Sequence, residues 1–247
     1  MKTCMFTNMD ADYLGRFQRT KKSVEEYLSM LDSNMTDLDK VVLAHEFITK
    51  KTQYASVSTV SHSAGGALGD GKAVCQGYTE AMTLLMEYAG VEVDEAISKS
   101  MNHSWSYVKI DGNWYHLDAT WDDTQRGTDE VYAHRFLIRN AEEFRTIKGN
   151  SRAHSDWYFY YDTKEESTST QFTNWFVHDV AGFMYYHNGL WYYRDKNTNS
   201  IKCSDIYGNH MQIVIDGTNQ TDKIQITGMQ GDVMYYKIGS AQYTKEI

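Results

Sequence analysis

The chain has 247 residues and a mass of 28.5 kDa, enough for one large domain or two modest ones. Hydrophobic residues make up 41% and aromatic residues 14% of it, a composition that excludes disorder of the whole chain. The formal net charge of -9 argues against nucleic acid or an anionic membrane surface as a partner, because both select a basic face. The three cysteines, Cys4, Cys75 and Cys203, form neither a CxxC pair nor a disulfide framework, so at least one thiol should be free.

Apolar residues repeat at helical spacing between Ser23 and about Lys50. The pattern predicts two helices separated by residues 34–37, with Thr36 as the N-cap of the second. Residues 61–72 are small, polar and rich in glycine, so they should form an irregular approach to Cys75. The run after Cys75 predicts a further helix that ends at Gly90.

Two alternating runs, residues 103–110 and 113–120, predict a β-hairpin around Asp111-Gly112, a dipeptide typical of a type I′ turn. In that register His103 faces Thr120 and Asp118 faces Trp105. His103 and Asp118 are then diagonal neighbours on one face of the hairpin. Their Cα atoms would lie about 7–8 Å apart, within reach of a hydrogen bond between the side chains. A slip of one residue would place them on opposite faces.

Beyond Ser167 the chain consists of short strand-like runs separated by Asn, Gly and Asp turn signals. Residues 182–186 weakly echo residues 232–236, at a spacing within the range of propeller blades. We expect a small sheet or the stub of a longer array, joined by a linker at residues 163–174. The predicted domains are therefore residues 1–162 and a β-rich region over residues 163–247. Its Trp191, Tyr192 and Tyr193 could form a binding face, but the core of a small sheet is preferred.

Cys75 stands at a predicted helix N-terminus, where the macrodipole favours a thiolate over a thiol. The alternative is an ordinary buried cysteine. A neighbouring His103–Asp118 pair would supply a base whose tautomer is fixed by a carboxylate, as a cysteine nucleophile requires, although such a pair can also be purely structural.

Other polar and aromatic side chains carry weaker signals. For Trp105, Trp114 and Trp121, cross-strand packing is preferred over the lining of a cleft. His116, Asp122 and Asp123 match no metal-ligand spacing, so they are expected to be solvated surface residues.

Three motifs together resemble the bacterial transglutaminase-like, papain-like cysteine peptidase superfamily. They are residues 73–78 (AVCQGY), 102–105 (NHSW) and 111–123 (DGNWYHLDATWDD). The upstream helix, with Tyr54 after it, and residues 135–137 extend the resemblance to about residues 37–138. The family often reads His-Ala-Trp-Asn where this chain has Ser104 and Ser106, a departure that concerns local substrate contacts and leaves the triad intact.

The resemblance implies an α+β fold in which a helix bearing Cys75 packs on an antiparallel sheet bearing His103 and Asp118. It implies that Cys75 is the nucleophile, His103 the general acid and base, and Asp118 the orienting carboxylate. The backbone N–H of Cys75 would help bind an oxyanion, and Gln53 and Tyr54 are candidates for a second donor.

The expected function is hydrolysis of peptide or amide bonds through a thioester, with a protein or peptide as substrate and with no cofactor or metal. The alternatives are a glutamine transamidase or deamidase, and a non-enzymatic binding or scaffolding module of a larger secreted bacterial protein. No run reaches the ~18–20 apolar residues of a membrane span, and the N-terminus does not resemble a signal peptide. A secreted or cell-surface location is preferred because modular proteins with such tails resemble exported ones, and a cytoplasmic one stays possible.

Overall fold

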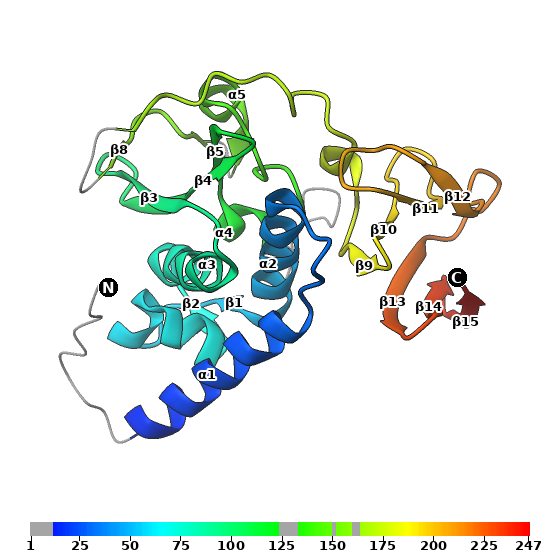
Figure 1. Ribbon diagram of the computed structural model, residues 1–247, viewed down its shortest axis with the longest axis horizontal. Helices are drawn as coiled ribbons and strands as arrows, with labels where there is room; N and C mark the ends of the chain where they lie inside the picture. The colour runs from blue at the N-terminus through cyan, green and yellow to red at the C-terminus, as the bar shows by residue number, and fades with distance from the viewer. Residues whose placement is uncertain (1–11, 124–132, 150–151, 160–163) are drawn as a thin grey trace.

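The computed structural model describes residues 12–123, 133–149, 152–159 and 164–247 (Figure 1). Cys4 lies outside these residues, and the two cysteines within them, Cys75 and Cys203, are free thiols. Within the same residues, no helix is both long and apolar enough to cross a lipid bilayer.

The two predicted N-terminal helices are present as α1 (Tyr13–Ser29) and α2 (Asp37–Lys51). Thr36 is the N-cap of α2 and forms a capping box with Asp39, as its position predicted. Helix α1 begins ten residues earlier than Ser23, the predicted start. In its first turns the apolar Leu14 and Phe17 are exposed rather than packed, and Arg16 and Arg19 each bind Asp70 at 2.6 Å across the fold.

The glycine-rich approach to Cys75 is built from short elements rather than from a loop alone. It contains a 3₁₀ turn, η1 (Thr59–His62), and a π-helical turn, η2 (Gly65–Gly69). Strand β2 (Lys72–Ala73) pairs in parallel with β1 (Gln53–Tyr54). Helix α3 (Cys75–Ala89) follows and stops at Gly90, whose φ of 76° is the left-handed stop expected from the sequence.

The central sheet has the strand order β5-β4-β3-β8 and is antiparallel throughout. Its strands are β3 (Val93–Ser98), β4 (His103–Ile110), β5 (Asn113–Leu117) and β8 (Tyr158–Phe159). Asp111 and Gly112 have φ values of 49° and 81°, as a type I′ turn requires, and Ser106 pairs with Leu117 in the predicted register. Strand β5 ends at Leu117, three residues early, because Asp118 caps the short helix α4 (Ala119–Asp122).

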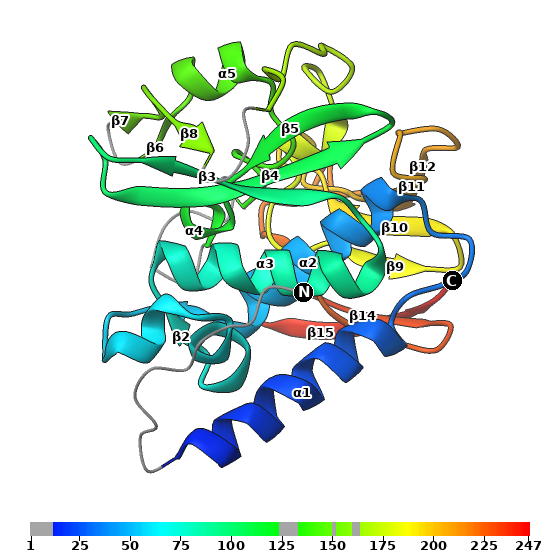
Figure 2. The same ribbon diagram turned by 60° about the vertical axis from the view of Figure 1, so that its left-hand side comes forward.

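Helix α3 runs beneath this sheet and packs against β4 (Figure 2). The α+β class is confirmed, with a cysteine-bearing helix on an antiparallel sheet. Helix α5 (Ala141–Thr146) and the antiparallel pair of β6 (Lys148–Gly149) and β7 (Arg152–Ala153) lie between β5 and β8 in the chain.

The C-terminal part is β-rich, as predicted. After a 3₁₀ turn, η5 (Phe176–Asp179), it contains one sheet of four strands and one of three. The first comprises β9 (Tyr185–His187), β10 (Leu190–Arg194), β11 (Ile201–Ser204) and β12 (Gln212–Ile215). The second comprises β13 (Ile224–Gln230), β14 (Val233–Ile238) and β15 (Ala241–Glu246).

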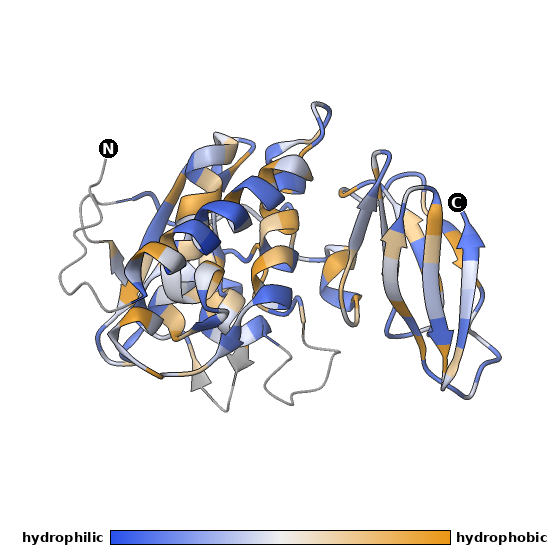
Figure 3. Cartoon of the chain, turned by 90° about the horizontal axis from the view of Figure 1, so that it is seen from below, coloured by the Kyte–Doolittle hydropathy of each residue, from blue (hydrophilic) through white to orange (hydrophobic). Residues whose placement is uncertain are grey.

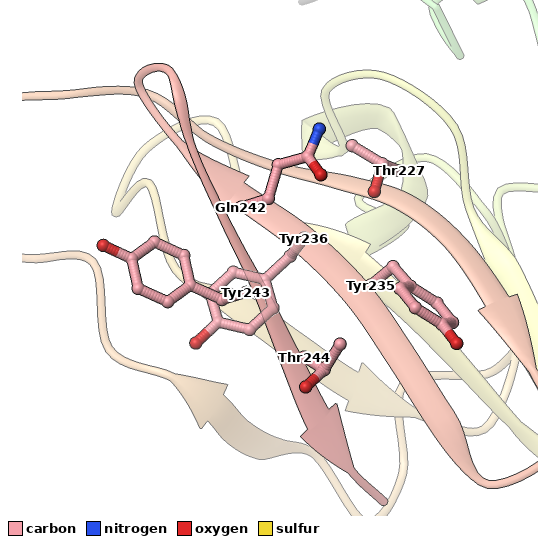
Figure 4. Close-up of a pocket in the computed structure, with 6 residues that line it drawn as sticks. All are labelled: Thr227, Tyr235, Tyr236, Gln242, Tyr243 and Thr244. Atoms are coloured by element: carbon pink, nitrogen blue, oxygen red, sulfur yellow. The ribbon is translucent and has the colours of Figure 1, made fainter.

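The two echoing segments open equivalent hairpins. Tyr185 and Tyr186 begin β9, Tyr235 and Tyr236 lie in β14, and both hairpins turn at a glycine of positive φ. The second sheet carries a shallow hollow of about 520 Å³ (Figure 4). It is lined by Thr227, Tyr235, Tyr236, Gln242, Tyr243 and Thr244.

One hydrophobic core crosses from the helices into the first β-rich sheet. Figure 1 shows α2 between α3 and that sheet, and Trp191 of β10 donates its indole N–H to Asp39 of α2 at 2.7 Å. Trp191, Tyr192 and Tyr193 are buried, so their prediction as core residues is confirmed. The second sheet lies further out, on a smaller cluster around Ile224 and Met234 (Figure 3). The boundary at residues 162 and 163 stays a prediction.

The predicted linker is tied to the body of the protein where it is described. Residues 164–170 have no helix or strand, as a linker should. However, Tyr107 donates its hydroxyl hydrogen to the carbonyl of Glu165, and the backbone N–H of Ala141 donates to the carbonyl of Ser167. Ser167 and Phe172 are buried.

Candidate active site

Three elements bring the predicted triad together. Cys75 is the first residue of α3, His103 the first of β4, and Asp118 follows β5 as the N-cap of α4. His103 Nε2 lies 2.6 Å from Asp118 Oδ2. The same imidazole interacts with the Cys75 thiol and lowers its pKa, and since Nε2 is engaged by Asp118, Nδ1 is the nitrogen left for the thiol.

The electrostatics favour a charged pair between sulfur and imidazole. Burial raises the pKa of the Cys75 thiol, but the hydrogen bond and charge of His103 and the backbone N–H of Ser104 lower it below its ordinary value. Burial also opposes a charge on His103, yet Asp118 and Cys75 together raise its pKa to about 10. Cys75 as a residue is half-buried.

Asp118 is completely buried and fully hydrogen-bonded. Its Oδ1 accepts the backbone N–H groups of Thr120 and Trp121 at 3.0 and 3.2 Å, and its Oδ2 accepts from both His103 and His154. Burial alone would raise the pKa of this carboxyl, but the two histidines hold it well below its usual range. Sequence reasoning missed His154 because a single histidine in an irregular segment carries no pattern.

The N-terminus of α3 approaches η1 closely, and the approach depends on Gly77. The Val74 N–H donates to the Ser61 carbonyl at 2.9 Å. A Cβ on Gly77 would lie 2.5 Å from that same carbonyl oxygen and 2.8 Å from the Ala73 Cβ. Gly77, two residues after Cys75, therefore fixes the position of the Cys75 sulfur.

As the first residue of α3, Cys75 presents a backbone N–H with no acceptor inside the helix, which suits an oxyanion donor. Gln53 and Tyr54 lie in β1 beside the strand that leads into Cys75. Gln53 is exposed and Tyr54 half-buried, and both remain candidates for the second donor.

The three tryptophans of the hairpin region have different surroundings. Trp105 is buried in an aromatic cluster, and Trp114 stacks on Tyr107 with ring centroids 5.1 Å apart, so packing is confirmed for both. Trp121 instead stacks on His103, with centroids 5.2 Å apart and planes 20° from parallel. Trp121 thus covers one face of the imidazole.

The prediction that His116, Asp122 and Asp123 are solvated was wrong, because all three are at most 1% exposed. His116 accepts the Trp105 indole N–H, Asp122 receives His45 Nε2 at 3.2 Å, and Asp123 accepts the Tyr78 hydroxyl at 2.6 Å. In the sequence these polar residues appeared to be exposed, because their hydrogen-bond partners come from distant parts of the chain.

Two clusters in the described residues have an arrangement that could hold a metal ion. One is His103, Asp118 and His154, and the other is the buried group His45, Glu46 and His134. In both clusters, the atoms that would bind a metal are already hydrogen-bonded to one another. Asp118 binds His103 at 2.6 Å and His154 at 2.9 Å in the first, and Glu46 binds His134 at 2.5 Å in the second.

Comparisons with known proteins identify the core. Residues 27–119, which include all three triad positions, match the model of the transglutaminase-like superfamily. No curated protein matches the chain. One similar solved structure is a TGase, 16% identical with a TM-score of 0.38, over 47% of this chain and 35% of that one. Another is described as a candidate cysteine protease from Cytophaga hutchinsonii, 21% identical with a TM-score of 0.33, over 46% of this chain and 43% of that one.

The chain spans less than half the length of either solved protein. The family match, by contrast, covers the helix that carries Cys75, the hairpin that carries His103, and Asp118 directly after that hairpin. Residues 27–119, which contain Cys75, His103 and Asp118, therefore match the transglutaminase-like superfamily, a group of cysteine-dependent enzymes that includes both cysteine peptidases and transglutaminases.

Proposed function

We propose that the protein hydrolyses peptide or amide bonds through a thioester on Cys75. The observation that supports this most is the 2.6 Å bond between His103 and Asp118 beside Cys75, whose pKa that imidazole lowers at the N-terminus of a helix. That arrangement provides a thiolate, an imidazolium and a fixed carboxylate, the three groups that acyl transfer to sulfur requires.

In the first half of the reaction, the Cys75 thiol proton resides on His103 Nδ1 and the thiolate attacks the carbonyl carbon. The backbone N–H of Cys75 stabilises the resulting oxyanion. As the C–N bond breaks, the imidazolium gives its proton to the departing amine. The products are a free amine, a thioester on Cys75 and a neutral His103.

In the second half, His103 removes a proton from water, which attacks the thioester carbon. The C–S bond breaks, the carboxylic acid product leaves, and the proton returns to the thiolate–imidazolium pair. We propose water over an amine because water is the default second nucleophile. An amine in its place would give transamidation through the same thioester.

The pH dependence of Cys75 alkylation by iodoacetamide tests the thiolate–imidazolium pair. The pKa of Cys75 is lowered and that of His103 is raised to about 10. The ion pair should therefore already form below pH 8.5, the approximate pKa of an ordinary thiol, and persist up to about pH 10. Cys75 should therefore react at pH 6 at least about tenfold faster than an ordinary thiol. Cys203 is an internal control, because burial raises its pKa.

Two variants complete the test. His103→Ala should remove the reactivity of Cys75 at pH 6, and Asp118→Asn should reduce it, while the Cys203 rate stays the same. A Cys75 that is inert in the folded protein, or that titrates as an ordinary thiol in wild type, would leave the non-enzymatic binding module as the better explanation. Product analysis of peptides, with and without a primary amine, separates hydrolysis from transamidation.

A further inference from the structure

His154 occupies a special place behind the triad. Its Nε2 lies 2.9 Å from Asp118 Oδ2, the same oxygen that binds His103 at 2.6 Å. It reaches Asp118 from the segment after β7, which is separate from all elements that carry the triad. The imidazole is completely buried.

Aromatic rings enclose the His154 imidazole. It stacks on Phe144, with centroids 3.8 Å apart, and lies 4.6 Å from Trp105 and 4.2 Å from Trp121. Burial lowers the pKa of His154, so the ring is neutral at pH 7. The other titratable groups around it are His103, His116 and Asp118.

The neutral ring has one N–H, and its position can be inferred. Among the described residues, His154 Nδ1 has no hydrogen-bond partner. A buried N–H without an acceptor is unfavourable, whereas Nε2 faces a carboxylate that accepts a proton. His154 is therefore the Nε2–H tautomer and donates to Asp118.

We propose that His154 is a positioning residue of this site, which holds Asp118 Oδ2 against His103 and so sustains the imidazolium that faces Cys75. The inference rests on the proposed function and extends it to a fourth side chain. Without the His154 N–H, Oδ2 keeps one donor where it now has two, in a place with no exposure to solvent. A buried carboxylate that has lost a donor rotates or admits water to regain one, and its bond to His103 weakens.

Three variants separate this role from simple packing. His154→Phe keeps an aromatic ring against Phe144 but removes the N–H. His154→Gln restores an amide N–H near the position of Nε2. His116→Phe is the matched control, because His116 is equally buried in the same aromatic cluster and is hydrogen-bonded to Trp105 rather than to the triad.

The first readout is the pKa of His103, followed by NMR of histidine labelled with ¹⁵N in the full chain, which does not depend on the thiol being reactive. The pKa of His103 should fall by about one unit or more in His154→Phe, because a charge-assisted bond is weakened, and should recover in His154→Gln. It should stay within about 0.3 units in His116→Phe. A His103 pKa that is unchanged or higher in His154→Phe overturns the inference.

The second readout is iodoacetamide alkylation of Cys75 at pH 6, which should slow about tenfold in His154→Phe and not in His116→Phe. An equal loss in both variants would mean that His154 only fills space, and would also overturn the inference. If wild-type Cys75 is unreactive but the His103 pKa still falls in His154→Phe, the proposed function fails and the positioning role stands. If Cys75 is reactive and His103 is insensitive to His154, the function stands and the positioning role fails.

Discussion

Glu46 lies at the centre of a buried polar network that the proposed chemistry does not use. Its Oε1 binds His134 at 2.5 Å and His45 at 3.4 Å, and its Oε2 accepts the backbone N–H of Met184 at 2.9 Å. Burial by itself would raise the pKa of this carboxyl, but the two histidines lower it to about 2. The Glu46 side chain of α2 thus binds two histidines and also the backbone just before the first strand of the first β-rich sheet.

The low pKa of Glu46 predicts how stability depends on pH. Because the folded pKa is lower than the unfolded one, ionised Glu46 stabilises the protein above about pH 4.5, and this contribution is lost as pH falls toward 2. Glu46→Gln should lower the free energy of unfolding at pH 7 by about 3 kcal/mol, and the difference from wild type should shrink between pH 4.5 and 2.5. Chemical denaturation at several pH values measures it.

Glu92→Gln is the control for this prediction. Glu92 pairs with Lys109 at 3.0 Å on the surface, so its loss should change stability by less than about 1 kcal/mol. A difference between Glu46→Gln and wild type that is the same at pH 7 and pH 2.5 would contradict the assigned role of the Glu46 charge.

At the scale of elements, the position of the first turn of α3 depends on Gly77, which has no side chain. Gly77→Ala would place its Cβ 2.5 Å from the Ser61 carbonyl oxygen, so helix and η1 must separate. We expect a loss of about 1–3 kcal/mol in stability and a slower alkylation of Cys75 at pH 6, since the sulfur moves with the turn. Thermal unfolding and the alkylation rate measure the two effects.

Gln76 offers a control in the same turn. Its side chain is exposed and contacts only Glu80, at 3.1 Å, among the bonds that the structure describes. Gln76→Ala should therefore leave stability within about 0.5 kcal/mol of wild type and the alkylation rate unchanged. Equal effects at both positions would mean that the close approach of α3 to η1 does not set the place of Cys75.

At the scale of the whole molecule, the hydrophobic core does not follow the predicted domain division. Side chains from the C-terminal part lie in the same buried cluster as those of α1, α2, α3 and the central sheet. They include Phe172, Trp175, Val177, Val180, Met184, Trp191, Tyr193 and Ile206. The smaller cluster around Ile224 and Met234 is separate from it.

This division of the core predicts opposite results for two truncations. A chain of residues 1–162 should lose cooperative unfolding, because removing even one buried tryptophan costs about 3–5 kcal/mol and domains are stable by only about 5–15 kcal/mol. A chain of residues 1–222 should unfold cooperatively, because it keeps the large core. Circular dichroism during heating follows both. If residues 1–162 unfold cooperatively at the wild-type midpoint, the predicted boundary is that of an independent domain.

The sequence by itself determined the features that depend on neighbours along the chain. The cap at Thr36, the stop at Gly90 and the Asp111-Gly112 turn were predictable because capping and turn geometry depend on a few adjacent residues. The hairpin register followed from the turn, and with it the pairing of His103 with Asp118, only 15 positions apart.

Only the tertiary structure decided the contacts between elements without a fixed register. The bond of His154 to Asp118 joins positions 36 apart, and that of His45 to Asp122 joins positions 77 apart. Polar residues such as Asp122 therefore looked solvated until the fold supplied their partners. The early start of α1 likewise depends on Asp70, and the shared core depends on Trp191 meeting α2. In each case the reason is the same: a period or a turn is encoded locally, whereas burial and long-range pairing exist only once the elements have packed.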